Sequence, residues 1–260
     1  MSWLQSDDEI IVHPQRRMLS RVLGLDDMTH DIKRLRLAIE AGGPFAFSAG
    51  QFASLGFADL PARDYSMASR PDEPILEFHI RRMGEGASAY VAGRLCRDDT
   101  VTVTGPLGSA FLRRQHGGPI VAIAGGSGLA PIKSIVETAL AAGKTQPIHL
   151  YFGARDERDI YLERDFRALA AAHPNFRFTP VLSEPSAPTA RRRGLVHEAA
   201  CADLDTVAGA KAYVAGAPAM VEAATRLLID VKGMRREDVH ADAFYSEAEK
   251  RALAIAAVVL

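Results

Sequence analysis

The chain has 260 residues, of which 48% are apolar, enough for one large core or, as we expect here, two modest ones. Its formal net charge of −1 excludes the strong basic excess by which proteins bind a nucleic-acid backbone. The two cysteines, Cys96 and Cys201, offer no disulfide framework or metal-ligand set. The most apolar stretch, residues 252–260, is far shorter than the roughly 20 residues of a membrane span. We therefore expect a cytoplasmic protein without nucleic-acid or membrane partners.

The first half of the chain alternates apolar and polar residues, as half-buried strands do. The pattern is seen at Leu35, Leu37 and Ile39, and again in residues 76–80 and 101–103, with Gly and Pro clusters between them. Short antiparallel strands that close into a barrel are predicted. We assign residues 1–113 to this barrel domain.

After residues 114–118, which we interpret as a linker, the pattern changes to continuous apolar strands that alternate with helical segments. The expected strands cover residues 119–124, 148–152, 176–182, 211–215 and 238–241. A helix after the first strand should bury one face and end at Gly143, with a face made of Ile132, Ile135, Val136, Ala139 and Leu140. Residues 119–260 are therefore predicted to form a doubly wound α/β domain with a parallel sheet.

A Gly-rich turn joins the first of these strands to its helix. Gly125, Gly126, Ser127 and Gly128 can bring backbone N–H groups close to an anion at the positive end of the helix, and Pro131 is tolerated in the first helical turn. The turn is therefore predicted to hold a pyrophosphate. A tight turn without a ligand is the alternative.

A second stretch, in the barrel half, combines the groups that a flavin needs. Arg63, Tyr65 and Ser66 offer a cation for a diphosphate, a flat ring and a hydroxyl within four residues. On a strand Arg63 and Tyr65 point to the same side, while Ser66 points to the other side or starts a bend. An ordinary strand end with a surface arginine is the alternative.

The order of these motifs along the chain resembles that of the ferredoxin–NAD(P)H reductase superfamily. Within it the chain is most similar to the reductase components of ring-hydroxylating dioxygenase systems of the naphthalene type. The motifs that carry the resemblance are Arg63-x-Tyr65-Ser66, HIR at 79–81, GASAY at 86–90, GPLG at 105–108, GGSGLAP at 125–131, YFGAR at 151–155, GAPAM at 216–220 and ADAFY at 241–245. The resemblance implies a six-stranded Greek-key barrel that binds FAD, followed by an NAD(P)H-binding domain.

The resemblance also implies roles for residues of the barrel. Arg63 pairs with the FAD phosphate, Tyr65 packs on the flavin ring and Ser66 reaches N5. The remaining FAD contacts fall in two short stretches, His79, Ile80 and Arg81 along the ribityl and diphosphate region, and Gly86, Ala87 and Ser88 at the start of a helix.

In the second half, the resemblance implies that Gly126, Ser127 and Gly128 bind the nicotinamide dinucleotide. Ala154 and Arg155 lie near the adenine ribose in this interpretation. The nicotinamide side is shaped by Gly216, Ala217, Pro218 and Met220, and the flavin is approached by Asp242, Phe244 and Tyr245. Ser66, Tyr65, Asp242 and Phe244 form the expected catalytic group.

Two departures from the family pattern affect the chemistry. Many relatives have a cysteine where this chain has Ala215, so any rate contribution from that thiol is missing. The four cysteines of a plant-type [2Fe–2S] domain are also missing, so we expect no iron–sulfur cluster in this chain. The chain is then either a natural two-domain reductase or part of a longer one. The first 17 residues look like the linker after such a domain, and residues 246–260 are interpreted as a surface helix.

The implied activity is transfer of electrons from NADH or NADPH through FAD, singly, to a [2Fe–2S] ferredoxin or an iron–sulfur domain of an oxygenase system. Three basic pairs are candidates for docking an acidic ferredoxin: Arg16-Arg17, Arg81-Arg82 and Arg113-Arg114. Solvated surface charge is the alternative for each pair. A flavin reductase that uses flavin as a substrate and a non-catalytic nucleotide-binding subunit are the alternatives, while a hydrolase is disfavoured because no G-x-S-x-G turn exists.

The choice of nucleotide stays open. Arg155 and Arg191-Arg192-Arg193, the latter interpreted as an exposed loop, are candidates for a 2′-phosphate, whereas Asp156 and Glu184 favour a ribose diol. By resemblance we favour NADH with some tolerance of NADPH.

Overall fold

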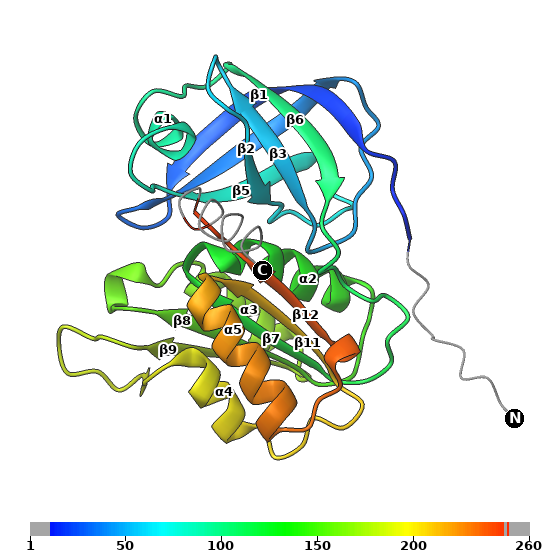
Figure 1. Ribbon diagram of the computed structural model, residues 1–260, viewed down its shortest axis with the longest axis vertical. Helices are drawn as coiled ribbons and strands as arrows, with labels where there is room; N and C mark the ends of the chain where they lie inside the picture. Colours follow the sequence, from blue (N-terminus) through cyan, green and yellow to red (C-terminus); the bar gives the residue numbers. More distant parts are fainter. Residues whose placement is uncertain (1–10, 247–248, 250–260) are drawn as a thin grey trace, which may run out of the picture.

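The computed structural model describes residues 11–246 and residue 249, which form two lobes, one above the other in Figure 1. The start of the expected N-terminal linker, residues 1–10, and most of the expected C-terminal helix lie outside the described residues. Between residues 11 and 246, no helix has the length and apolar character needed to cross a bilayer.

The upper lobe is an antiparallel sheet that curls into a nearly closed barrel. Its strands are β1 (Arg16–Asp27), β2 (Ile32–Ala41), β3 (Phe52–Phe57), β4 (Arg63–Ser66), β5 (Ile75–Arg81) and β6 (Thr100–Leu107), in the order β4-β3-β6-β1-β2-β5. A bridge between Met67 and Phe78 links the two ends of this order. The predicted alternation is confirmed, because Leu35, Leu37 and Val103 lie in the barrel core. One short helix, α1 (Ala87–Gly93), follows β5.

The lower lobe is the predicted doubly wound domain. Its sheet contains β7 (Ile120–Gly125), β8 (Ile148–Ala154), β9 (Phe176–Leu182), β10 (Arg192–Arg193), β11 (Lys211–Gly216) and β12 (Val239–Ala243), and every pairing in it is parallel. The order β10-β9-β8-β7-β11-β12 places β7 beside β11, where the direction of winding reverses. Ligands of such sheets bind at the carboxyl ends of the strands at this reversal.

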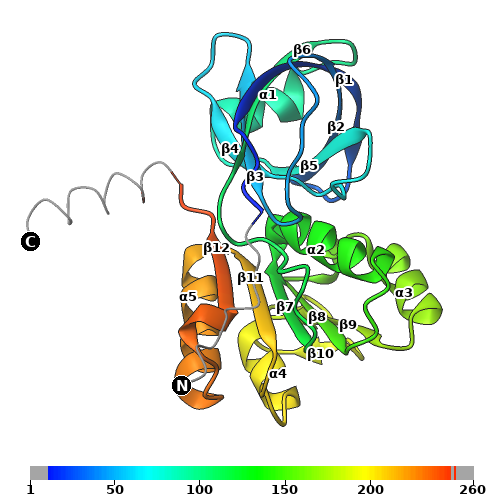
Figure 2. The same cartoon turned by 90° about the vertical axis from the view of Figure 1, so that its right-hand side faces the viewer.

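Helices cover both faces of the parallel sheet, as Figure 2 shows edge-on. One face carries α2 (Leu129–Ala141) and α3 (Glu163–Ala172), and the other carries α4 (Val196–Asp203) and α5 (Pro218–Arg226), which continues as one π-helical stretch, Leu227–Val231. The shorter 3-10 turns are η1 (Gly126–Gly128), η2 (Glu157–Asp159) and η4 (Arg236–Asp238). The predicted face of α2 is confirmed, because all five of its apolar residues are buried.

The two lobes share an apolar contact built around α2. Ile32 and Ala49 of the barrel belong to the same buried cluster as Ile132 and Ile135 of α2. The backbone N–H of Leu112 donates to the carbonyl of Ala49 across the connection between the lobes. The helix is therefore enclosed by the barrel above it and the sheet below it, and this fixes the groups at its N-terminus.

Three segments differ from the sequence-based expectation. The expected linker in fact leads into a strand from Arg16, because Met18, Ser20 and Val22 alternate inward in β1. The interpretation of the three arginines as a loop is wrong for two of them, since Arg192 and Arg193 pair with β9. The last strand runs to Ala243 rather than ending at residue 241. The boundary at residues 114–118 lies within a longer stretch, 108–119, without helix or strand.

Candidate functional site

A large cavity lies between the barrel and the carboxyl ends of the parallel strands. Its volume is about 1530 Å³, more than the ~300 to 1,000 Å³ of a usual small-molecule site. Of the residues predicted from sequence, the lining includes Arg63, Tyr65, Ser66, His79, Arg81, Gly86, Ala87, Ser88, Gly126, Ser127, Ala154, Arg155, Ala217, Met220, Asp242, Phe244 and Tyr245. It does not include Ile80, Gly128, Gly216 or Pro218.

Strand β4 forms one wall of this cavity. Its pairing with β3 places Ser66 opposite Phe52 and Arg63 opposite Leu55, so that Tyr65 and Ser66 face different sides. Burial raises the pKa of Tyr65 to about 12, which keeps its hydroxyl neutral. The Arg63 guanidinium donates to the carbonyl of Ala62 at 3.0 Å.

Ser66 of the barrel and Asp242 of the lower lobe both line the cavity and are joined by a hydrogen bond. The Ser66 hydroxyl donates to Asp242 Oδ2 at 3.3 Å, although the two residues are 176 positions apart. Burial raises the pKa of Asp242, and the hydrogen bond from Ser66 offsets only part of this effect. Asp242 and Phe244 belong to β12 and the turn after it, where the Phe244 N–H donates to the carbonyl of Gly216 at 2.9 Å.

The Gly-rich turn ends β7 and begins α2. Gly126 has φ +54°, which favours glycine, and Arg81 Nη1 lies 3.3 Å from the point where a Cβ at this residue would stand. Gly128 has a different role: a Cβ there would stand 2.1 Å from the carbonyl oxygen of Ala215. Gly128 therefore allows α2 to approach β11 closely, and it lies outside the lining.

Alternation along β5 separates the HIR residues. Ile80 points into the barrel core, so only its backbone can face a ligand. Arg81 lies in the cavity and forms an ion pair of 2.7 Å with Asp31. Asp31 could not be identified from local sequence, because its position depends on the register that pairs Ile32 with Arg81.

At the start of α1, the backbone is more available than the side chain. Gly86 has φ +91° and precedes the helix, while the Ser88 hydroxyl is engaged by the backbone of Met83, accepting from its N–H at 3.0 Å and donating to its carbonyl at 3.2 Å. The N–H groups around Ala87 thus remain the more suitable contacts for a phosphate at this place.

The far end of the cavity lies beyond β8. Arg155 is exposed there and lines the cavity together with Ser183 and His197. Asp156 is held by the hydroxyl of Ser186 at 2.7 Å. Arg191, another predicted phosphate partner, is held by Glu157 and Glu163.

His79 is part of a polar chain that the sequence did not indicate. Its side chain is buried, with Nε2 2.9 Å from Glu77 Oε1 and Nδ1 3.2 Å from the Tyr161 hydroxyl. Only the fold brings these residues together, since Tyr161 is 82 positions from His79. Among the described residues, no group of three or more His, Cys, Asp or Glu is placed to hold a metal ion.

Comparison with known proteins supports a nucleotide-binding redox site. Residues 122–226 match the family model described as an oxidoreductase NAD-binding domain. Over 243 residues the chain is 46% identical to the ferredoxin–NAD(P)(+) reductase component of naphthalene 1,2-dioxygenase and salicylate 5-hydroxylase systems from Ralstonia, which covers 93% of this chain and 73% of that protein.

Solved structures show the same architecture. The ferredoxin reductase in carbazole 1,9a-dioxygenase superimposes with a TM-score of 0.81 at 29% identity, over 92% of this chain and 73% of that one. A ferredoxin NADP+ reductase from Neisseria gonorrhoeae with bound FAD and NADP superimposes with a TM-score of 0.75 at 22% identity, over 88% of this chain and 99% of that one. At that identity the second likeness concerns the fold alone.

Proposed function

Since this chain belongs to the ferredoxin–NAD(P)(+) reductase family and contains an oxidoreductase NAD-binding domain, we propose that it binds FAD and passes electrons from NAD(P)H to a [2Fe–2S] ferredoxin or iron–sulfur domain of an aromatic-ring-hydroxylating oxygenase system. The observation that carries this proposal is the hydrogen bond between Ser66 and Asp242, which joins the two lobes at one cavity. We propose the cytoplasm as its location, which is consistent with two unpaired cysteines.

The residues of the barrel wall fit FAD. Tyr65 and Phe52 offer ring surfaces, Ser66 a hydroxyl, and Arg63 and Arg81 cations for a diphosphate, all from the lining of one cavity. The cavity volume of about 1530 Å³ leaves room for a second nucleotide. Bound FAD supplies chemistry that the side chains lack, because it takes two electrons from a nicotinamide and releases them one at a time.

The chain contributes position and shielding to this reaction. The hydrogen bond from Ser66 to Asp242 orients the hydroxyl, which would lie beside a bound flavin ring, and Tyr65 would pack on the face of that ring. Ala217 and Met220, at the start of α5, lie where a nicotinamide can approach from the parallel sheet. Phe244, which is partly buried, and Tyr245, which is exposed, complete the wall on that side.

Arg63→Ala is expected to weaken FAD retention at least roughly tenfold, because it removes a charge-assisted contact to a phosphate. The measurement is the flavin content after extensive dialysis and the Kd for added FAD. Arg97→Ala is the matched control, since Arg97 is an exposed arginine of the same lobe outside the cavity lining. Retention of a full flavin complement by Arg63→Ala contradicts the assigned role.

Arg155→Ala is expected to raise the KM for NADPH about fivefold and to change the KM for NADH less than twofold. The reason is that Arg155 lines the cavity end beyond β8, where a 2′-phosphate gains from a cation, while Asp156 is engaged by Ser186. Steady-state kinetics with both nucleotides test this. Arg158→Ala, which changes an exposed neighbour outside the lining, should change neither value. Equal effects of Arg155→Ala on both nucleotides contradict the assignment.

The acceptor can dock best at the basic pair nearest the flavin. Arg81 and Arg82 line the cavity, and Arg82 is exposed, whereas Arg113 packs over the ring of Phe111 at 4.2 Å. The rate of electron transfer falls with distance, so we propose that an acidic partner docks around Arg82.

The proposed function is tested by NADH-dependent bleaching of a plant-type [2Fe–2S] ferredoxin. Reduction of free riboflavin without any reduction of ferredoxin contradicts the proposal.

A further inference from the structure

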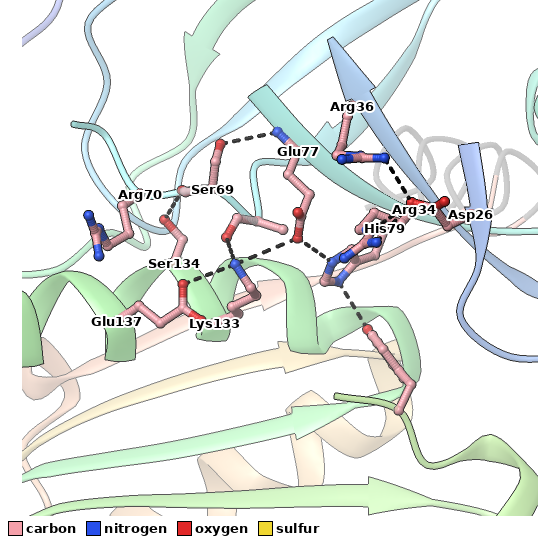
Figure 3. A network of polar contacts seen from close by, with 12 residues as sticks. Asp26, Arg34, Arg36, Ser69, Arg70, Glu77, His79, Lys133, Ser134 and Glu137 are labelled. Carbon is pink, nitrogen blue, oxygen red and sulfur yellow. Dashed lines mark hydrogen bonds and ion pairs between the residues drawn. The ribbon is translucent and has the colours of Figure 1, made fainter. Parts of the chain in front are cut away.

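A largely buried series of polar groups runs from α2 of the lower lobe through β5 of the barrel (Figure 3). Lys133 Nζ donates to Glu137 Oε2 at 2.9 Å and to the carbonyl of Ala68 at 3.2 Å, and it lies 3.6 Å from Glu77 Oε1. The same Glu77 oxygen contacts His79 Nε2 at 2.9 Å. The barrel strand and the helix are therefore joined by charged side chains of which only 12 to 17% is exposed.

The charge of Glu77 decides which nitrogen of His79 carries the proton. Burial alone raises the pKa of Glu77, but the hydrogen bond with His79 and the charge of Lys133 outweigh it and hold this pKa at about 2. A carboxylate can only accept, so His79 Nε2 carries a hydrogen. Burial lowers the pKa of His79, and the hydrogen bond with Glu77 offsets only part of this effect. The ring is then neutral at pH 7, and Nδ1 is an acceptor.

Tyr161 continues the series of polar groups into the lower lobe. Burial raises the pKa of Tyr161 well above its ordinary value, so the hydroxyl keeps its proton. That hydroxyl lies 3.2 Å from His79 Nδ1 and 3.4 Å from the carbonyl oxygen of Gly126, and one proton can be shared between these two acceptors. The ring packs edge-on against His79 and Phe152, with centroids 5.3 and 5.6 Å away.

The contact with Gly126 reaches the phosphate-binding turn from behind. The Gly126 carbonyl also accepts the Leu129 N–H, as the first turn of the helix requires. Because the peptide is planar, the N–H of Ser127 points opposite to that carbonyl, toward the open end of the turn. Gly126 and Ser127 both line the cavity, whereas Tyr161 does not.

We propose that Tyr161, oriented by His79 and Glu77, is a positioning residue that holds the Gly126 peptide so that the Ser127 N–H faces the phosphates of the bound nucleotide. The barrel thereby sets the geometry of a turn that belongs to the other lobe. This inference rests on the proposed function, because it assumes that a nicotinamide dinucleotide binds at the turn.

The test compares Tyr161→Phe with the wild-type holoenzyme in calorimetric titrations with ADP-ribose and with adenosine. Loss of one hydrogen bond should raise the Kd for ADP-ribose about threefold to tenfold. Adenosine has no phosphate, so its Kd should change less than twofold. Tyr151→Phe is the matched control, since it removes the hydroxyl of another buried tyrosine of the lower lobe, in β8 and outside the cavity lining, and should change neither Kd.

Each other outcome decides against the proposal. An unchanged Kd for ADP-ribose means that the hydroxyl does not position the turn, and equal increases for both ligands mean general loosening of the subsite. Loss of FAD from Tyr161→Phe, with FAD retained by Tyr151→Phe, means that the polar groups around Tyr161 support FAD binding by the barrel and do not position the turn. If the wild-type holoenzyme binds neither ligand, the proposed function fails instead.

Discussion

Gly128→Ala is expected to lower the free energy of unfolding by about 3 kcal/mol and to remove nucleotide binding, because its Cβ has no space. The Cβ would stand 2.1 Å from the carbonyl oxygen of Ala215 and 2.7 Å from the backbone nitrogen of Gly216, and neither can move without displacing β11. The backbone of Gly128 has φ −60° and ψ −14°, which alanine adopts readily, so the effect is one of space alone.

Urea unfolding of the wild type and of Gly128→Ala measures the difference in their free energies of unfolding. Gly117→Ala serves as the control, since a Cβ there meets nothing within 4 Å, and its stability should change by less than about 1 kcal/mol. Equal stability of the two variants contradicts the close packing of α2 on β11.

Ser66→Ala is expected to slow reduction of the bound flavin by NADH roughly 10²-fold, with FAD content unchanged. The hydroxyl is buried in the cavity floor and donates to Asp242, whose pKa burial raises. Removing it takes away the group proposed to stand beside the flavin and leaves Asp242 without this hydrogen bond.

Anaerobic stopped-flow absorbance gives the rate directly. Ser54→Ala in the neighbouring strand β3, outside the cavity lining, is the control and should keep the wild-type rate. If Ser66 and Asp242 act as a pair, replacing both should slow the reaction by less than the product of the single effects. A rate for Ser66→Ala within threefold of wild type contradicts the assigned role.

The pattern of buried residues could be predicted because it depends on local periodicity. Alternation in β2 and β5 and the apolar face of α2 each follow from the geometry of one element. The Gly-rich turn was likewise visible, but the same motif contains two kinds of glycine. Gly126 needs its positive φ, whereas Gly128 needs space against Ala215, and only the packing of α2 separates the two requirements.

The polar connections between the lobes could not be predicted, because they join residues far apart in the chain. Ser66 meets Asp242, Asp31 meets Arg81, and His79 meets Tyr161 only after both sheets have formed. For Arg191, the sequence suggested a contact that the fold does not favour. Its charge suggested a phosphate partner, yet Glu157 and Glu163 already engage it. The predicted ligand contacts of the individual cavity residues stay predictions.

If one cavity brings FAD and NAD(P)H together for electron transfer, the two can be followed in a single anaerobic absorbance titration of the purified protein. We expect the flavin spectrum to bleach on addition of one equivalent of NADH and to recover when an oxidised [2Fe–2S] ferredoxin is added. A protein reconstituted with FAD whose spectrum neither NADH nor NADPH changes would contradict this expectation.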